Sequence, residues 1–115
     1  MKYKKGHFYI ENVSAERIAK KFGTPAYVYS YDRIQSNINN FKKNFKNIDP
    51  LICFSVKSNS NIKILKQINK FGLGADVVSK GELIQALKAN IKPEKIVFSG
   101  VGKTYEELKF AISKK

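Results

Sequence analysis

The chain has 115 residues, of which 43% are hydrophobic and 27% are charged, and its formal net charge is +13. A chain of this length forms at most one domain with a modest core, and this composition excludes a disordered or collagen-like protein. The charge alone would favour nucleic-acid binding. However, only Arg17 and Arg33 are arginines, the residue type preferred for phosphate and base contacts. We therefore expect no nucleic-acid partner.

The sequence also shows no targeting signal, no pair of cysteines for a disulfide and no Cys-His pair typical of a nucleophilic site. The residues from Met1 to Lys5 are basic but lack the apolar run of a signal peptide, and no stretch approaches the length that spans a membrane. Cys53 is the only cysteine, so an internal disulfide is excluded, which is typical of a reducing compartment. His7 is the only histidine, which disfavours a Cys-His nucleophile. We expect a cytoplasmic protein without a metal site.

The first part of the chain predicts a strand at 7–10, a helix at 15–22 with Ser14 as its cap, and an end to that helix at Gly23. After Thr24-Pro25, which favours extended backbone, the β-rich residues 26–29 predict a second strand. Ser30 then caps a helix from Tyr31 to about Phe45. Its apolar residues recur at spacings of four, three and four.

From residue 51 onward, strands alternate with amphipathic helices. The predicted strands are 51–56, 75–79 and 95–98, and the predicted helices are 61–71, 80–90 and 104–113. This alternation predicts right-handed βαβ units with a parallel sheet. The fold class is therefore α/β, an incomplete parallel (β/α)8 TIM-type barrel of about three units. A closed barrel needs roughly 250 residues, so we expect the chain to be a piece of a larger protein.

The strand at 51–56 runs directly into Lys57. Ile52, Phe54 and Val56 make one face apolar, whereas the other face becomes small and polar towards the lysine. Ligands bind at the carboxyl ends of strands in α/β folds, so the small face is expected to look into a site. Lys57 is either a solvent-exposed lysine at a strand end or a desolvated amine that forms a Schiff base with a carbonyl compound.

Asp76 is the second candidate site residue. It lies in the otherwise apolar strand Ala75-Asp76-Val77-Val78, where an acid is disfavoured without a partner. Its side chain faces away from those of Ala75 and Val77, and from a neighbouring parallel strand it could approach Lys57. The two charges would form an ion pair, a site, or both.

The loop Gly100-Val101-Gly102-Lys103-Thr104 is not a phosphate-binding P-loop, because the required first glycine is replaced by Val97. The spacing of Thr104 and Glu107 predicts a capping box, and such a helix start could also meet an anion. The same spacing in Ser79 and Glu82 predicts a second cap.

Three linked segments resemble, in order and spacing, the amino-terminal half of the diaminopimelate decarboxylase barrels. They are residues 54–59 (FSVKSN), 74–83 (GADVVSKGEL) and 96–104 (IVFSGVGKT), and residues 24–29 (TPAYVY) match the family's lead-in. The resemblance covers roughly Gly23 to the end of the chain. This family consists of pyridoxal-phosphate enzymes with an alanine-racemase-like barrel and is related to ornithine and arginine decarboxylases.

The resemblance implies that Lys57 is the lysine that holds pyridoxal 5'-phosphate, and that Asp76 lies near this cofactor. Glu82 matches a family glutamate, although its capping position accounts for it equally. The implied reaction converts meso-2,6-diaminopimelate, a small amino-acid substrate, to L-lysine and carbon dioxide in lysine synthesis. The cofactor is the electron sink of this chemistry.

The remaining family features, including the residues that bind the cofactor phosphate and a carboxy-terminal β domain, lie later in the family's chains. We therefore expect a lead-in at 1–23 and a partial barrel domain at 24–115, inactive alone, with a homodimer completing the active site at full length. Three alternatives stay open. The first is an ornithine- or arginine-type decarboxylase, and the second is a non-catalytic relative that binds pyridoxal phosphate or only a partner protein. The third, disfavoured by the scarcity of arginine, is a small basic nucleic-acid binder, which steep salt dependence of binding would support.

Overall fold

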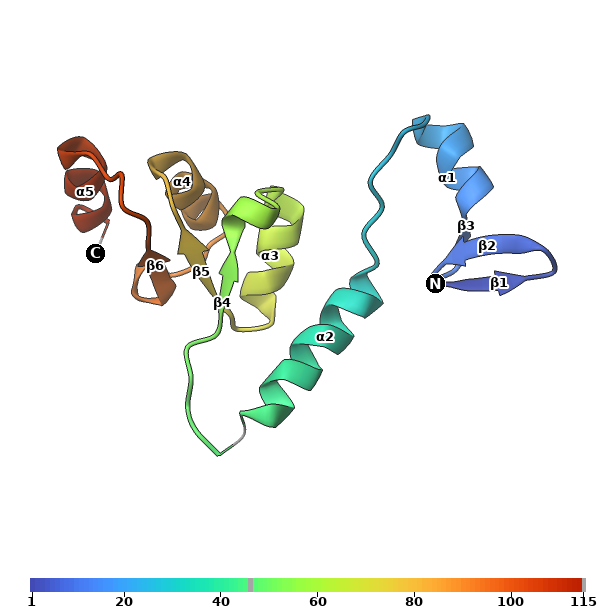
Figure 1. The fold of residues 1–115 in the computed structure, drawn as a ribbon, viewed down its shortest axis with the longest axis horizontal. Helices are drawn as coiled ribbons and strands as arrows, with labels where there is room; N and C mark the ends of the chain where they lie inside the picture. The colour runs from blue at the N-terminus through green and yellow to red at the C-terminus, as the bar shows by residue number, and fades with distance from the viewer. Residues whose placement is uncertain (46, 115) are drawn as a thin grey trace. The chain divides into compact units, whose positions relative to one another are not determined.

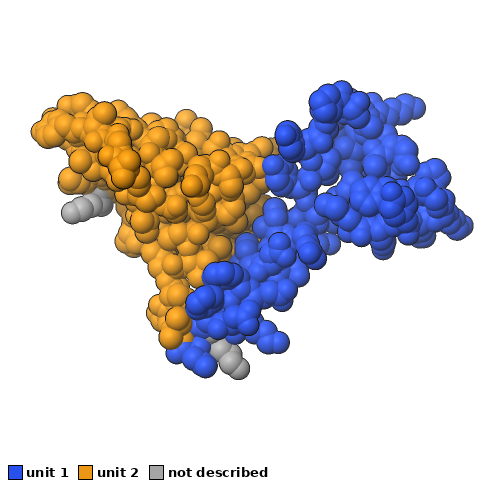
Figure 2. Space-filling view, in the orientation of Figure 1, with its two compact units in different colours: residues 1–47 blue, residues 48–115 orange. Residues whose placement is uncertain are grey.

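The computed structural model of the protein describes residues 1–45 and 47–114. The chain divides into two compact units, residues 1–47 and residues 48–115 (Figure 2). Each unit has its own sheet: an antiparallel one in the first and a parallel one in the second. Among the described residues, no helix has both the length and the apolar character needed to cross a membrane.

The first unit begins with a small antiparallel sheet in the order β1-β2-β3. Its strands are β1 (Lys2–Lys4), β2 (His7–Ile10) and β3 (Val13–Ser14). Lys5 and Gly6 join β1 to β2, and both have positive φ, as a two-residue hairpin turn of the type I′ kind requires. The strand at 7–10 was predicted correctly, whereas β1 and β3 were not predicted.

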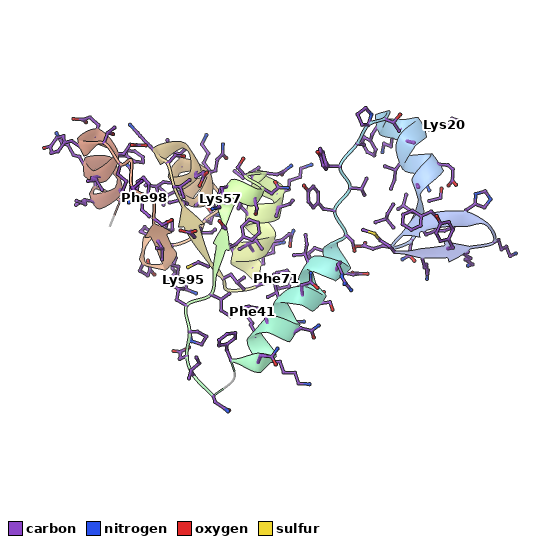
Figure 3. All side chains as sticks on the ribbon, in the orientation of Figure 1. Lys20, Phe41, Lys57, Phe71, Lys95 and Phe98 are labelled. Atoms are coloured by element: carbon purple, nitrogen blue, oxygen red, sulfur yellow. The ribbon has the colours of Figure 1, made fainter. Side chains whose placement is uncertain are left out.

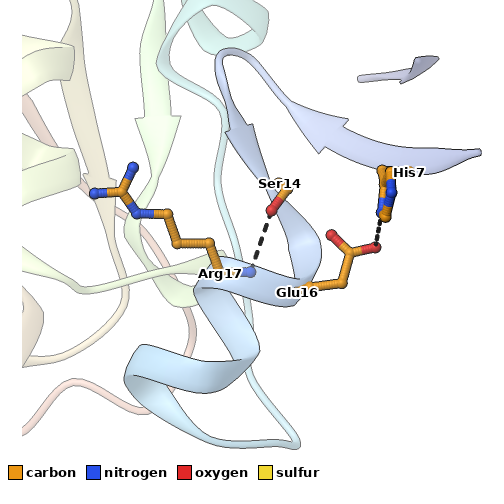
Figure 4. A network of polar contacts seen from close by, with 4 residues as sticks. All are labelled: His7, Ser14, Glu16 and Arg17. Atoms are coloured by element: carbon orange, nitrogen blue, oxygen red, sulfur yellow. Dashed lines mark hydrogen bonds and ion pairs between the residues drawn. The ribbon is translucent and has the colours of Figure 1, made fainter. Parts of the chain in front are cut away.

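Helix α1 (Ala15–Phe22) has the predicted bounds and the predicted cap. The Ser14 side chain accepts a hydrogen bond from the backbone N of Arg17 at 3.2 Å (Figure 4). Gly23 at the other end of the helix has a φ of 79°. His7 Nδ1 lies 3.2 Å from Glu16 Oε1, which links β2 to the first turn of the helix (Figure 4). A hydrogen bond from the backbone of Glu16 to its own carboxylate is the largest cause that lowers the pKa of Glu16, and the contact with His7 lowers it further.

Helix α2 (Tyr31–Asn44) also starts at its predicted cap, Ser30. Ser30 is 7% exposed, and its hydroxyl donates to Glu11 Oε1 (2.8 Å) while accepting from the backbone N of Arg33 (3.1 Å). The same Glu11 oxygen accepts from the backbone N of Asp32 (3.0 Å). These hydrogen bonds lower the pKa of Glu11, the one from Asp32 being the largest cause. Glu11 therefore anchors the start of α2 from the loop after β2.

The predicted strand at residues 26–29 is wrong. These residues have no strand hydrogen bonds with any described residue, and Tyr27 is 94% exposed. Their β-favouring side chains support an extended backbone, but a strand needs a neighbouring strand to accept its hydrogen bonds. A pattern of residue types cannot supply that neighbour.

The second unit is a βαβαβ arrangement followed by a helix (Figure 1). Its strands pair in parallel in the order β4-β5-β6, so each strand lies beside the next one in the sequence. The elements are β4 (Cys53–Ser55), the 3₁₀ turn η1 (Val56–Ser58), α3 (Ile62–Lys70), β5 (Gly74–Val77), α4 (Lys80–Lys88), the 3₁₀ turn η2 (Pro93–Lys95), β6 (Ile96–Phe98) and α5 (Tyr105–Ile112). The α/β class and the parallel sheet are as predicted, although β4 is shorter than residues 51–56.

The core of this unit lies between the sheet and its helices. Val56, Leu65, Ala75 and Val77 are fully buried. The rest of the buried cluster comes from α4 and the residues after it, and the apolar side chains of β4, β6 and α5 pack against it: Leu83, Ala86, Ala89 and Ile91, with Phe54, Ile96, Phe98 and Phe110 at the margin. The face of the sheet that carries Phe54, Ala75 and Val77 is therefore the helix-covered face, as the apolar pattern predicted.

Candidate functional site

Lys57 lies at the carboxyl end of β4, within η1, as Figure 3 shows. Val56, which is fully buried, anchors the turn in the core on one side of the lysine. On the other side the hydroxyl of Ser58 donates to the carbonyl O of Ser55 (2.7 Å), and the backbone N of Asn59 donates to the carbonyl O of Val56 (3.0 Å). The backbone of Lys57 is therefore held firmly, while its side chain is exposed.

The amine of Lys57 has no ion pair and no hydrogen bond with any residue that the structure describes. It is thus a free primary amine at the end of the sheet where ligands bind in α/β folds. In Figure 3, Lys57 and Phe98 lie at the same end of the sheet, whereas Lys95 lies at the other. The prediction that a lysine stands at the carboxyl end of this strand is confirmed.

The strand register defines the face beside this end. Ser55 pairs with Asp76, and Asp76 pairs with Val97, so these three residues form one row across the sheet. Cys53 pairs with Gly74 and belongs to the same face, because side chains two residues apart in a strand point the same way. We call the face defined by Cys53, Ser55, Gly74, Asp76 and Val97 the small face. It lies opposite the helix-covered face.

Gly74 shows how closely the chain packs on the small face. A Cβ atom added there would overlap the carbonyl O of Lys95 and would lie 2.9 Å from Cys53 Sγ. Cys53 belongs to β4, and Lys95 is the last residue of η2, directly before β6. A glycine is therefore required at this position for steric reasons, and not for an unusual φ.

Asp76 is partly buried in the middle strand, and its Oδ1 accepts a hydrogen bond from the hydroxyl of Ser99 at 2.5 Å. The expected ion pair between Asp76 and Lys57 does not form between these two described residues. Ser99 instead satisfies the acid, which lies one row before the strand ends. The signal for this contact in the sequence is that Ser99 is two residues after Val97 and so continues the same face.

Cys53 is not an activated nucleophile. Burial is the main cause that raises the pKa of its thiol, and the charge of Asp76 raises it further. Sγ also approaches the carbonyl O of Lys95 at 3.9 Å. A raised thiol pKa disfavours the reactive thiolate, in agreement with the interpretation of Cys53 as a packing residue.

Both predicted helix caps are present, but only the one at Thr104 is a complete capping box. Ser79 accepts from the backbone N of Glu82 (3.2 Å), but the Glu82 carboxylate accepts from the backbone N of Val78 (2.9 Å) rather than from the cap residue. Thr104 and Glu107 form the complete capping box. Glu107 Oε2 accepts from Thr104 N (3.0 Å), and Glu107 Oε1 accepts from Lys80 N at the start of α4 (3.1 Å). The carboxylate of Glu107 therefore accepts hydrogen bonds at the starts of both α4 and α5.

Most of the chain, including Lys57 and the small face, matches one protein family. Residues 31–115 match the model of the pyridoxal-binding domain of the pyridoxal-dependent decarboxylases. The chain belongs to this family. Lys57, Asp76 and Ser99 all fall within the matched residues, and pyridoxal phosphate is the cofactor of the family.

Individual relatives agree with this family. The diaminopimelate decarboxylase of Aquifex aeolicus is 46% identical over 112 residues, which are 97% of this chain and 26% of that protein. The crystal structure of the enzyme of the same name from M. jannaschii, in complex with L-lysine, has a TM-score of 0.91 at 39% identity and covers 98% of this chain and 27% of that one. For the Helicobacter pylori enzyme with L-lysine the TM-score is 0.81 at 45% identity, covering 85% and 25%. The chain thus spans about a quarter of the length of these relatives.

The residues present fit part of the cofactor of this decarboxylase family. Pyridoxal phosphate needs a primary amine for its carbonyl group, and Lys57 has an exposed amine that no described residue engages. The small face beside it is built from side chains of low volume and holds one carboxylate, that of Asp76. In the described part of the chain, no cluster of three or more His, Cys, Asp or Glu residues could hold a metal ion.

Proposed function

We propose that the chain is the amino-terminal, lysine-bearing part of a diaminopimelate decarboxylase, which converts meso-2,6-diaminopimelate to L-lysine and carbon dioxide. The observation that carries the proposal is the free amine of Lys57 at the carboxyl end of β4, in a chain of the pyridoxal-dependent decarboxylase family. The names of the relatives supply the substrate. The ornithine- or arginine-type alternative has weaker support, because the ornithine decarboxylase of Entamoeba histolytica is 28% identical to this chain with a TM-score of 0.53.

In this proposal the amine of Lys57 would hold the cofactor through the carbonyl group of the cofactor. When bound, the cofactor supplies the electron sink for the bond that loses carbon dioxide. The turn η1 keeps the lysine backbone in place through the buried Val56, so the amine extends from a defined point at the end of β4. Asp76 contributes a negative charge on the small face, near the cofactor.

We also infer the setting of the full-length enzyme. Cys53 is the only cysteine of the sequence and has no disulfide partner in it, which is compatible with a reducing, cytoplasmic location. An incomplete site on one quarter of the relatives' length requires further segments, and a homodimer completes it in this proposal. We place the start of the barrel domain at Thr24, directly after Gly23 ends α1, with residues 1–23 as the lead-in.

Borohydride reduction of the full-length protein with pyridoxal phosphate tests the assignment of Lys57. We expect the mass of the reduced cofactor on the peptide that contains Lys57, because reduction makes the link between amine and cofactor permanent. Lys57→Ala should remove both this label and the absorbance of the bound cofactor. Peptide mass spectrometry and a spectrum before reduction provide the two readouts.

Lys63→Ala is the matched control. Lys63 is an exposed lysine in the first turn of α3, six residues from Lys57, so its loss should leave labelling and absorbance unchanged. Label on a different lysine in the wild type would refute the role of Lys57. Label on Lys57 without release of carbon dioxide from diaminopimelate would leave a cofactor-binding relative and reject the decarboxylase.

A further inference from the structure

Ser99 follows β6 directly and is bound to β5 twice. Its backbone N donates to the carbonyl O of Val77 (2.9 Å), which extends the ladder between the two strands by one residue. Its hydroxyl donates to Asp76 Oδ1 at 2.5 Å. The backbone hydrogen bond fixes the position of Ser99. The hydroxyl hydrogen bond then orients the Asp76 carboxylate relative to Ser99.

This hydroxyl is the only side-chain or backbone donor that reaches the Asp76 carboxylate from the described residues. Bonds between a hydroxyl and a carboxylate of this length are charge-assisted and stronger than neutral ones. The terminal torsion of an aspartate is broad, so without a donor the carboxylate has no preferred orientation. Ser99 therefore decides where the one negative charge of the small face points.

Other features of the sequence do not explain the bond. Val97, which pairs directly with Asp76, has an apolar side chain that cannot donate a hydrogen bond. The Lys57 amine forms no ion pair with Asp76. The ladder between β5 and β6 is already formed by backbone groups, so the sheet does not need the hydroxyl. The effect of the contact falls on the carboxylate and not on the strand pairing.

We propose that Ser99 is a positioning residue of the active site, which orients the Asp76 carboxylate through its hydroxyl and thereby sets the electrostatic surroundings of the group bound to Lys57. This rests on the proposed function of Lys57. It assigns to the loop after β6 a role in the chemistry that none of its helix-capping contacts explains. Ser99 acts through Asp76 and does not itself contact the reacting atoms.

The test is made on the full-length enzyme loaded with pyridoxal phosphate. Ser99→Ala should lower kcat by about ten- to a hundredfold, the equivalent of one hydrogen bond to a charged group, with a smaller change in KM. It should also shift the absorption spectrum of the bound cofactor. Ser99→Thr, which keeps a hydroxyl on the same carbon, should restore both. Ser113→Ala is the matched control, because the Ser113 hydroxyl only donates to the carbonyl O of Phe110 (2.7 Å) on α5.

A double-mutant cycle separates orientation from folding. In an Asp76→Ala background, Ser99→Ala should cause no further loss of kcat, because its effect passes through that carboxylate. The proposal is overturned by wild-type kcat and spectrum in Ser99→Ala, by additive losses in the cycle, or by a defect that Ser99→Thr leaves unrepaired. If the wild type carries no cofactor on Lys57, the proposed function fails first. The spectrum of the unmutated protein shows this before any Ser99 variant is made.

Discussion

At Gly74, the position that a Cβ atom would occupy is crowded by three neighbouring heavy atoms. The carbonyl O of Lys95 and the sulfur of Cys53 crowd the position of its missing Cβ, and the Cδ1 atom of Leu51 lies 3.2 Å from it. An added methyl group must displace backbone, and overpacking of this kind costs about 1–3 kcal/mol or more. We expect Gly74→Ala to lower the free energy of unfolding by at least that amount, as measured by urea denaturation.

Gly102→Ala supplies the control for this change, because nothing lies within 4 Å of the corresponding Cβ position. It should change the free energy of unfolding by less than about 0.5 kcal/mol, the usual range for surface substitutions. Equal effects of the two substitutions would show that the crowding at Gly74 is relieved at little cost.

The pattern of single residues predicted much of the candidate site. Alternation along residues 51–57 was enough to separate the small face from the helix-covered one and to place Lys57 at the end of the strand. Alternation also placed Asp76 on the small face. It could not show that Ser99, and not Lys57, would satisfy the acid, because this depends on strand register and on a side-chain torsion, which residue spacing does not determine.

At the scale of elements, the carboxylate of Glu107 joins two helix starts. It accepts from the backbone N of Thr104 at the cap of α5 and from the backbone N of Lys80 at the start of α4. A negative charge is favourable at both helix N-termini. These hydrogen bonds, the one from Thr104 first, lower the pKa of Glu107 below its ordinary value of 4.5.

The sign of the pH dependence follows from this shift. Because the pKa is lower in the folded than in the unfolded protein, the stabilisation is present above about pH 4.5 and is lost as the pH falls through the folded value. We expect Glu107→Gln to be less stable than the wild type at pH 7 and to differ less from it below pH 4. Thermal unfolding across this pH range is the measurement.

Glu106→Gln is the control, since Glu106 lies in the same first turn of α5 but forms no hydrogen bond or ion pair with the described residues. Its unfolding profile should follow that of the wild type. A Glu107→Gln curve parallel to the wild type at every pH would contradict a contribution from the charge of the carboxylate.

Helices were easier to predict than strands for a physical reason. A helix satisfies its hydrogen bonds within a contiguous segment, and the caps Ser14, Ser30 and Thr104 mark where each one begins. A strand is completed by another segment, so the extended residues 26–29 failed as a strand. The short strands β1 and β3 formed around a hairpin and a turn whose only signals were Gly6 and the pair Glu11-Asn12.

At the scale of the whole molecule, the 115-residue chain buries few large side chains for its length. Among residues 1–45 and 47–114, ten hydrophobic residues form the buried core, whereas Tyr27, Val101 and Phe22 are among many that are mostly exposed. Exposed apolar side chains in such numbers are unusual for a protein that is stable alone. We expect the isolated chain to bind the dye ANS and to melt over a broad temperature range.

The full-length protein serves as the reference for this measurement, with the same dye and the same heating rate. It should bind little dye and should melt in a narrow range. A sharp, cooperative transition of the isolated, monomeric chain would contradict the expectation and would show that the two units are sufficient by themselves.

The strand order β4-β5-β6 also has a consequence for how the protein is made. β5 and β6 each pair with the strand synthesised just before them. Contacts that are local in sequence form quickly, and chains grow on the ribosome at only about 5–20 residues per second. The scaffold of Lys57 can therefore assemble during translation, seconds before the more distant parts of a longer polypeptide have emerged.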